Sequence, residues 1–360
     1  MILHAVTLEN FRNYDKVTLS PSAGINYIYG KNAQGKTNLL EAINLFATAK
    51  SFRAARDTEM IRFGAKEAKI HGKITAHGRD MTGEITLSSD KRKKIAVNGV
   101  VLEKTSALLG EFPVVVFSPD ELHLISGAPE GRRRFMDSAI CARKPSYYSV
   151  LHEYIRIWKQ KNVLLKKAPK PEDLAVWNLQ LAARGAILME YRKNFFAALA
   201  PICQAFHGEI AAGEVLSVRY APSVILKEDR KAQEEAILAA LEKKSEAEIA
   251  VGQSLIGPHR DEIQFFINDR AAREYASQGQ QRTAAVVLKV AQAALLEKET
   301  GEKPLLLLDD VMGELDAHRR AFLAENMKGR QTVITGTDKD DVKGADAIFF
   351  VEDGKACISA

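Results

Sequence analysis

The residues from position 30 to position 37 constrain this chain more than any other segment. They are Gly30, Lys31, Asn32, Ala33, Gln34, Gly35, Lys36 and Thr37. This run satisfies the phosphate-binding pattern GxxxxGK[ST] in full. In such a loop the glycines let backbone N–H groups face phosphates, the lysine reaches the β- and γ-phosphates, and the threonine hydroxyl ligates Mg²⁺. The pattern predicts that the chain binds ATP with Mg²⁺.

The segments on both sides of this loop support that interpretation. Residues 25–29 form an apolar and aromatic run typical of a buried strand, and residues 36–49 carry apolar side chains at helical spacing. A strand, a glycine loop and a helix are the context that a phosphate-binding loop requires. A glycine turn without a ligand is therefore the weaker interpretation.

Two adjacent carboxylates supply the acids that such a loop needs. The apolar run 305–308 ends in Asp309 and Asp310. Solvated acids at a strand end are common, but these two lie where a phosphate-binding loop requires them. We expect Asp309 to hold the metal together with Thr37, and Asp310 to orient or deprotonate the attacking water. The sequence therefore predicts ATP hydrolysis, with Lys36 as a further catalytic group.

The patterns along the chain divide it into three parts. Residues 1–118 read as strands and turns around one helix, with a hairpin turn at Asn98-Gly99. Residues 119–253 are overwhelmingly helical in pattern, and residues 254–360 return to α/β character. We expect one α/β ATPase domain, split by an inserted helical lobe.

The middle part contains a predicted antiparallel helical pair. Apolar residues recur at helical spacing over 151–158 and again over 174–191. The connection 166–171 holds two prolines and turns the chain back. The apolar stripe persists for only a few heptads, which excludes a long coiled coil.

A predicted helix begins about 30 residues before the acidic strand. Ser277, Gly279 and Gln280 open a long predicted helix, and a serine there is ordinarily only an N-cap. Ser277 lies 32 residues before Asp309 (309 − 277), which is the arrangement of the signature motif in ABC-class ATPases. In that class this helix N-terminus meets the γ-phosphate held by the partner's loop. The order therefore predicts an ATP-dependent homodimer.

Composition and charge indicate the cellular compartment in which the protein works. The net charge is +5, and the longest apolar runs have strand length, which is too short for a membrane span. No charged-then-apolar leader opens the chain, and the three cysteines lie far apart. We expect a cytoplasmic protein without membrane association. The spacing of His123, His207 and His259 matches no metal-ligand motif, so we expect structural or solvated histidines.

Further motifs resemble those of the RecF family, bacterial recombination mediators related to SMC-type ATPase heads. The phosphate-binding loop with its continuation to residue 43 is one of them, and the resemblance covers essentially the whole chain. The other matching motifs are residues 10–14, 118–137, 159–162, 257–261 and 308–316. The resemblance implies an ABC-type P-loop ATPase head, a mixed sheet with helices, that carries an inserted α-helical lobe.

The resemblance also implies residue roles at the matching positions. The main ones are Ser277 as signature serine, Asp309 as Walker B aspartate, Asp310 as catalytic acid and Asp316 as dimer-contacting aspartate. It adds Arg12, Asn13, Asn38 and Gly279 to the residues around the nucleotide. Arg53 is either a phosphate-contacting arginine or an ordinary surface arginine.

Two positions depart from the expected patterns. Gly313 stands where a serine is expected before the Glu-Leu-Asp of the last motif. Thr337-Asp338 follows a predicted strand at the place where transporter-type ATPases keep a switch histidine. The group that senses the γ-phosphate is therefore not identified by its residue type.

The function implied by the resemblance is an ATP-gated DNA clamp in DNA repair, replication restart, recombination and the SOS response. ATP would close a dimer on duplex DNA near single-strand gaps, and weak ATPase activity would release it. The family works with RecO and RecR to load recombinase, which places the protein at the nucleoid. An SMC-type ATPase head is the alternative, but the 240 residues between Thr37 and Ser277 are too few for a long coiled-coil arm.

Basic runs give the sequence its own indication of a DNA partner. They lie at residues 91–94, at residues 132–134 and at Lys159, Lys161, Lys166 and Lys167. Such side chains neutralise phosphates and give salt-sensitive binding. A single charge run is usually only a solvated face. No aromatic platform for single strands is evident, so the duplex side of a junction is the expected target.

Overall fold

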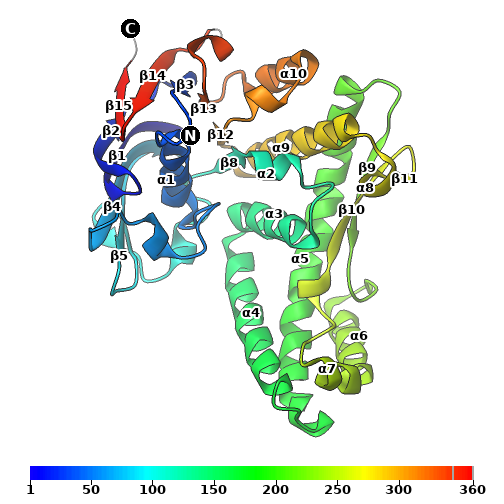
Figure 1. Ribbon diagram of the computed structural model, residues 1–360. Helices are drawn as coiled ribbons and strands as arrows, with labels where there is room; N and C mark the ends of the chain where they lie inside the picture. The colour runs from blue at the N-terminus through cyan, green and yellow to red at the C-terminus, as the bar shows by residue number, and fades with distance from the viewer. Residues whose placement is uncertain (343, 359–360) are drawn as a thin grey trace. The chain divides into compact units, whose positions relative to one another are not determined.

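The computed structural model describes residues 1–342 and 344–358, and these form two compact units (Figure 1). The ATPase unit comprises Met1–His123 and the chain from Arg282 onward, and the inserted unit is Leu124–Gln281. We expected boundaries at 118/119 and 253/254, so residues 254–281 lie in the inserted unit instead of the ATPase part. Within the described residues, no helix combines the length and the apolar character that crossing a membrane needs.

The first sheet of the ATPase unit is antiparallel, with strand order β2-β1-β4-β5-β6-β7. Asn98 and Gly99, both with positive φ, connect its last two strands as the sequence predicted. Its strands are β1 (Ile2–Phe11), β2 (Tyr14–Leu19), β4 (Glu67–Ala76), β5 (Arg79–Ser88), β6 (Lys94–Val97) and β7 (Val100–Val101).

The second sheet of the ATPase unit carries the predicted phosphate-binding loop. Its order is β15-β14-β3-β13-β12-β8, and every neighbouring pair is parallel except the final hairpin of β14 and β15. The strands are β3 (Ile25–Tyr29), β8 (Val114–Phe117), β12 (Leu305–Leu308), β13 (Thr332–Gly336), β14 (Ala347–Glu352) and β15 (Lys355–Ile358). Because β3, β12 and β13 are parallel, their carboxyl ends meet at one edge.

Helix α1 (Lys36–Thr48) contacts strands of both sheets. The ring of Phe46 lies against Gly72 and Gly83, where an added Cβ would come within 2.5 Å of ring atoms, and it stacks on Phe112 at 5.1 Å. Glycine is therefore required at two strand positions that would otherwise favour larger residues. The same unit contains α2 (Pro119–Leu122), most of α9 (Gln278–Thr300) and α10 (Ala317–Met327).

The inserted unit contains the helical pair that the sequence predicted. Helices α4 (Pro145–Leu165) and α5 (Ala175–Ile210) lie side by side and are joined at one end by a short connection (Figure 1). The unit's other helices are α3 (Pro129–Arg143), α6 (Arg230–Lys243), α7 (Ser245–Val251) and α8 (Ala272–Tyr275).

A three-stranded sheet also belongs to this unit, which the sequence predicted as an inserted helical lobe. It consists of β9 (Leu216–Ala221), β10 (Glu262–Ile267) and β11 (Arg270–Ala271). Strand β9 is six residues long and pairs antiparallel with β10, Tyr220 opposite Ile263. The partner strand comes about forty residues later in the chain, so the local pattern around β9 does not reveal it. The pairing also explains why residues 254–281 belong to this unit.

Buried ion pairs occupy the centre of the inserted unit. Arg192 donates to Asp261 at 2.7 Å and to Asp137 at 2.9 Å, and it is 2% exposed. Lys161 pairs with Glu248 at 2.5 Å, with both side chains fully buried. Three of these residues, Asp137, Lys161 and Asp261, belong to the predicted motifs. A buried charge needs a partner, so losing either member of one of these pairs would destabilise the unit.

The histidine in the motif 257–261 is also structural. His259 lies 2.7 Å from the hydroxyl of Tyr154 and 3.1 Å from the carbonyl of Ser254. Burial lowers the pKa of His259 to about 4, so the ring is neutral at ordinary pH. Among the residues that the structure describes, no group of three or more His, Cys, Asp or Glu side chains is placed to hold a metal ion.

Candidate nucleotide site

The predicted loop connects β3 to α1, and its lysine points back into the loop. Lys36 is 4% exposed, and its Nζ donates to the carbonyls of Gly30 at 2.6 Å and Lys31 at 3.0 Å. Gly35 has a φ of 116°, and a Cβ there would lie 2.7 Å from Asn13. The loop therefore requires glycine at this position and holds a buried ammonium group among backbone carbonyls.

The carboxylate of Asp309 lies beside the threonine of the loop. Its Oδ1 accepts hydrogen bonds from Thr37 Oγ1 at 2.7 Å and from Thr335 Oγ1 at 3.0 Å. Burial raises the pKa of Asp309, and the hydrogen bond from Thr37 opposes that shift. A hydroxyl and a carboxylate in direct contact are two oxygen ligands of the kind that Mg²⁺ takes. This pair fits the metal role that the sequence predicted.

Asp310 carries an unpaired carboxylate oxygen and lines the same cavity as Thr37. Its backbone has a φ of 52°, and its N–H donates to Thr335 Oγ1 at 2.9 Å. Its Oδ1 is buried and has no hydrogen-bond partner. A buried carboxylate oxygen without a partner is costly, and such an oxygen is satisfied when a cation or water occupies the cavity beside it.

A cavity of about 250 Å³ brings these groups together. Its lining residues come from the loop, from the start of α1, from the segment after α1 and from the end of β12. They are Asn32, Ala33, Gly35, Lys36, Thr37, Asn38, Arg53 and Asp310. The guanidinium of Arg53 donates to Asn38 Oδ1 at 3.3 Å. Arg53 is therefore placed at the cavity, which supports the phosphate-contacting alternative for this residue.

Asn13 holds the outer half of the loop from the β1–β2 turn. Its Nδ2 donates to the carbonyl of Gln34 at 2.8 Å, and its Oδ1 accepts from Asn38 Nδ2 at 2.9 Å. Tyr14, the last residue of the motif at 10–14, donates its hydroxyl to the carbonyl of Gly35 at 3.0 Å. The turn thus fixes the loop through its carbonyls and leaves its N–H groups available.

Arg12 is engaged with helix α1. It forms a two-pronged ion pair with Glu41, at 2.9 and 2.8 Å, and donates to the carbonyl of Glu59 at 2.8 Å. Glu41 is fully buried and also accepts from Ser51 Oγ at 2.5 Å. In this structure Arg12 therefore acts as the partner of a buried carboxylate, one turn along α1 from Thr37.

We expect Arg12→Ala to destabilise the ATPase unit by about 3–5 kcal/mol, because it leaves the carboxylate of Glu41 buried without its cation. Urea unfolding measures the change. Arg62→Ala is the matched control: its partner Asp15 is 77% exposed, so the loss should stay below about 1 kcal/mol. An Arg12→Ala protein that unfolds like the wild type but binds ATP weakly would instead assign Arg12 to the nucleotide.

Ser277 forms the N-cap of α9 in the inserted unit. Its Oγ accepts from the N–H of Gln280 at 3.2 Å, and Gln280 Oε1 accepts from the N–H of Ser277 at 2.8 Å. This reciprocal pair is a capping box. Gln281 Nε2 bonds the carbonyl of Ala272 at 3.0 Å and so ties the preceding turn to the helix. The serine itself is exposed, as a residue that serves a second subunit must be.

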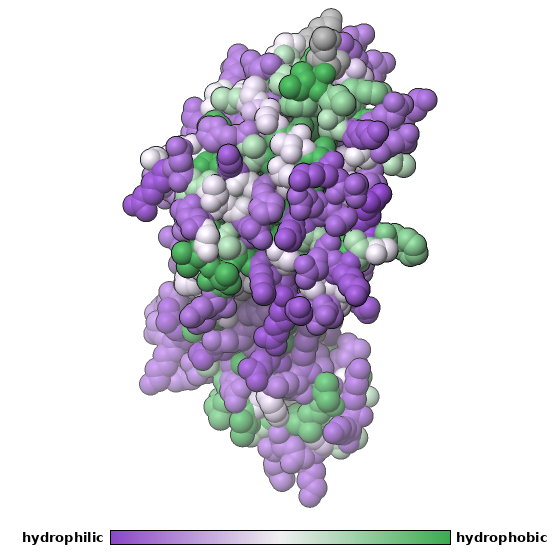
Figure 2. Space-filling view, turned by 90° about the vertical axis from the view of Figure 1, so that its left-hand side faces the viewer, coloured by the Kyte–Doolittle hydropathy of each residue, from purple (hydrophilic) through white to green (hydrophobic). Residues whose placement is uncertain are grey.

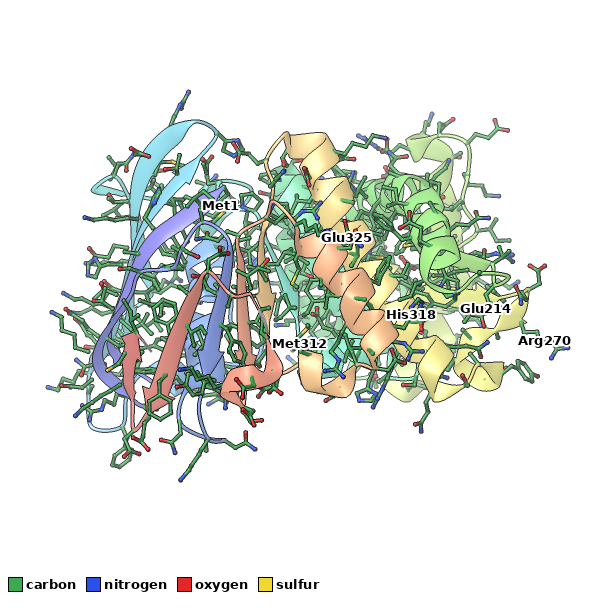
Figure 3. All side chains as sticks on the ribbon, turned by 90° about the horizontal axis from the view of Figure 1, so that it is seen from above. Met1, Glu214, Arg270, Met312, His318 and Glu325 are labelled. Atoms are coloured by element: carbon green, nitrogen blue, oxygen red, sulfur yellow. The ribbon has the colours of Figure 1, made fainter. Side chains whose placement is uncertain are left out.

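Asp316 likewise caps a helix. It precedes α10 and accepts from the N–H of Arg319 at 2.9 Å, and the Arg319 guanidinium also pairs with its carboxylate. The N–H of Arg319 lowers the pKa of Asp316. Arg319 Nε also donates to Thr283 Oγ1 at 2.8 Å, which ties α10 to α9. Figure 3 marks this segment by its labelled Met312, His318 and Glu325.

Thr335 is the site residue that sequence reasoning missed. It is the next-to-last residue of β13, the strand between β3 and β12, and its hydroxyl contacts both Asp309 and Asp310. A threonine at the carboxyl end of a strand adjacent to an acidic strand is the signal that could have revealed it. A second cavity of about 340 Å³ borders Gly30, Lys31 and Gln34 and is also lined by Thr337 and Asp338.

The chain is similar in sequence and in structure to known proteins. Residues 2–359 match the model of the RecF/RecN/SMC N terminal domain family. A curated relative from Alkaliphilus oremlandii, "DNA replication and repair protein RecF", is 41% identical and covers 99% of this chain and 100% of its own length. The solved "Structure of the recombination mediator protein RecF-ATP in RecFOR pathway" is 36% identical, with a TM-score of 0.92 and 99% and 97% coverage. A solved Smc head bound to a ScpA domain shares the fold, at 16% identity and a TM-score of 0.58.

Proposed function

This chain belongs to the RecF family of DNA replication and repair proteins, and from that premise we propose that it is an ATP-gated, DNA-binding recombination mediator. ATP closes a homodimer on duplex DNA near a single-strand gap, and slow hydrolysis releases it. With RecO and RecR it promotes recombinase loading at the nucleoid in the cytoplasm. The observation that carries this proposal is the cavity in which Lys36, Thr37 and Asp310 converge.

The residues of the site support nucleotide binding and hydrolysis. Lys36 exchanges its carbonyl partners for the β- and γ-phosphates, and the loop N–H groups bind the remaining oxygens. Thr37 and Asp309 would hold Mg²⁺, which neutralises charge on the phosphates when it is bound. Asp310 accepts the proton of the attacking water through its free carboxylate oxygen.

The predicted dimer contact rests on Ser277. A serine that only capped α9 would be sufficiently explained by its bond to Gln280. It is also exposed at a helix N-terminus, where the dipole favours an anion, and it precedes the acidic strand at the ABC spacing. We propose that it contacts the γ-phosphate bound to a second copy, and that Asp316 contacts the same neighbour.

The basic clusters differ in their suitability for DNA. Arg132 is 3% exposed and forms a two-pronged ion pair with Glu262, at 2.6 and 2.7 Å, so it is not available to a phosphate. Lys161 is buried against Glu248. Both residues are removed from the predicted set. The run at 91–94 keeps three exposed cations within four residues, Lys91, Arg92 and Lys94. The exposed Lys159, Lys166 and Lys167 are spread over nine residues, so the run at 91–94 is the favoured contact.

Sedimentation of the protein with ATP, with and without duplex DNA, tests the proposal. We expect a dimer that appears only with ATP and that binds duplex. If the protein contacts three phosphates, its affinity for duplex DNA should fall on the order of tens-fold between low and physiological salt. A protein that stays monomeric on DNA with ATP, or that binds DNA equally at high salt, contradicts the proposed clamp.

Substitution of the signature residue separates its two roles. We expect Ser277→Ala to abolish ATP-dependent dimers while lowering helix stability by only about 1 kcal/mol. Gln280→Ala removes the return bond of the same capping box and leaves the serine hydroxyl in place. It should therefore dimerise. Equal loss of dimers in both variants would show that only the cap matters.

A further inference from the structure

Phe63 is an aromatic side chain that the fold of the ATPase unit does not use. It is the most exposed large hydrophobic residue in the described chain, at 104% of its reference area. It occupies the second position of a turn that the N–H of Ala65 closes on the carbonyl of Arg62, at 2.9 Å. Gly64 follows with a left-handed φ of 86° and open space around it. Such a turn needs its glycine, but it accepts almost any residue at the position of Phe63.

The surroundings of Phe63 are strongly basic. The turn lies beside the loop between β5 and β6, because the N–H of Ser89 donates to the carbonyl of Lys66 at 3.1 Å. Residues 62–67 and 89–94 carry six basic and two acidic side chains, a net charge of +4 (6 − 2). The basic ones are Arg62, Lys66, Lys91, Arg92, Lys93 and Lys94. The acidic ones are Glu67 and Asp90.

Local ion pairs neutralise two of the six cations and leave the other four for a polyanion. Arg62 pairs with Asp15, and Lys93 pairs with Asp57. The side chains of Lys66, Lys91, Arg92 and Lys94 are exposed. On the face shown in Figure 2, hydrophilic residues predominate and hydrophobic ones form separate patches.

We propose that Phe63 stacks on an unpaired nucleobase next to a duplex whose phosphates bind the surrounding lysines and arginines. This inference rests on the proposed DNA-binding function and names the residue that reads the single-stranded side of a junction. An aromatic ring gives stacking without sequence preference, and adjacent cations hold the backbone. A protein partner is less favoured, because the residues that accompany Phe63 in both loops are charged or small and form no apolar patch.

The test compares two DNA probes with the full chain and ATP. One is a blunt duplex, and the other is the same duplex with a single-stranded extension whose first unpaired base is 2-aminopurine. The wild type should bind the extended probe more tightly and quench the 2-aminopurine. Phe63→Ala should lose the quenching and weaken binding of the extended probe about fivefold to a hundredfold, with blunt duplex binding unchanged. Phe63→Trp should restore both signals.

A matched control and the contrary outcomes complete the test. Val100→Ala removes another exposed apolar side chain, 67% exposed on β7, and should change neither probe. If the wild type binds the probes but Phe63→Ala behaves identically, the stacking inference is wrong while the DNA-binding function stands. Loss of RecR binding by Phe63→Ala with both probes unchanged assigns the ring to a protein and also overturns it. If the wild type binds neither probe, the proposed function itself fails.

Discussion

Lys36→Ala should lose ATP affinity by roughly 30-fold to several thousand-fold, measured by isothermal titration calorimetry. The lysine ammonium is almost fully buried and would pair with the β- and γ-phosphates at close range. Removing one member of a buried, hydrogen-bonded charge pair costs about 2–5 kcal/mol, which corresponds to that range. ATP-dependent dimers and DNA binding should disappear with the nucleotide.

The fold should survive this substitution. Lys36 donates to two loop carbonyls, so alanine leaves the carbonyls of Gly30 and Lys31 without that donor at a cost of about 1 kcal/mol. Lys298→Ala, which removes an exposed lysine of α9, is the control and should bind ATP normally. An Lys36→Ala protein whose ATP affinity stays within about threefold of the wild type would remove this lysine from the nucleotide site.

Asp310→Asn should bind ATP normally and hydrolyse it about a hundredfold to ten-thousandfold more slowly, because the amide cannot accept a proton from water. The dimer formed with ATP should therefore persist. Single-turnover hydrolysis and the lifetime of the dimer on DNA measure the two effects. The buried Oδ1 of Asp310 has no partner in the described structure, so the substitution disrupts no existing side-chain bond at that atom.

The exchange of Asp310 for asparagine should not strain the backbone. Asp310 has a φ of 52°, and asparagine tolerates that left-handed conformation as well as aspartate does. Asp353→Asn makes the same exchange at a φ of 46°, in the turn between β14 and β15 outside the Asp310 cavity. It should leave hydrolysis unchanged. If Asp310→Asn and Asp353→Asn lose activity equally, the loss does not come from proton transfer by Asp310. If Asp310→Asn hydrolyses ATP like the wild type, the catalytic base is another group.

Much of the ATPase unit could be predicted because its signals are local. The strand 25–29, the hairpin turn at Asn98-Gly99 and the strand 305–308 occur where the sequence predicted them. In each case neighbouring residues alone determine the backbone: a run of buried side chains, or a pair of residues that accept positive φ. The loop at 30–37 is also locally determined, because Lys36 bonds the carbonyls of Gly30 and Lys31 within the same eight residues.

The strand β9 shows where local reasoning fails. Its six residues are stabilised by pairing with β10, far along the chain, and the sequence around them gives no sign of that partner. Charge runs fail for a related reason. Arg132 and Lys161 lie in basic runs that the sequence offered as DNA contacts or solvated faces. Each instead has a distant acidic partner, Glu262 and Glu248, and both cations are buried. Burial is a property of the assembled unit, which no single segment contains.

The sequence by itself determined that this chain carries a phosphate-binding loop, an acidic strand and a helix start at the ABC spacing, since each is a short run of residues. Only the tertiary structure decided which side chains share a site. Thr335 meets Asp309 and Asp310 because parallel pairing brings the ends of two strands together, although 25 residues separate Thr335 from Asp310. It also decided that Arg12 pairs with Glu41 and that Phe63 has no place in the core. Contacts between distant segments depend on how the sheets and helices pack, and that packing is set by the whole core.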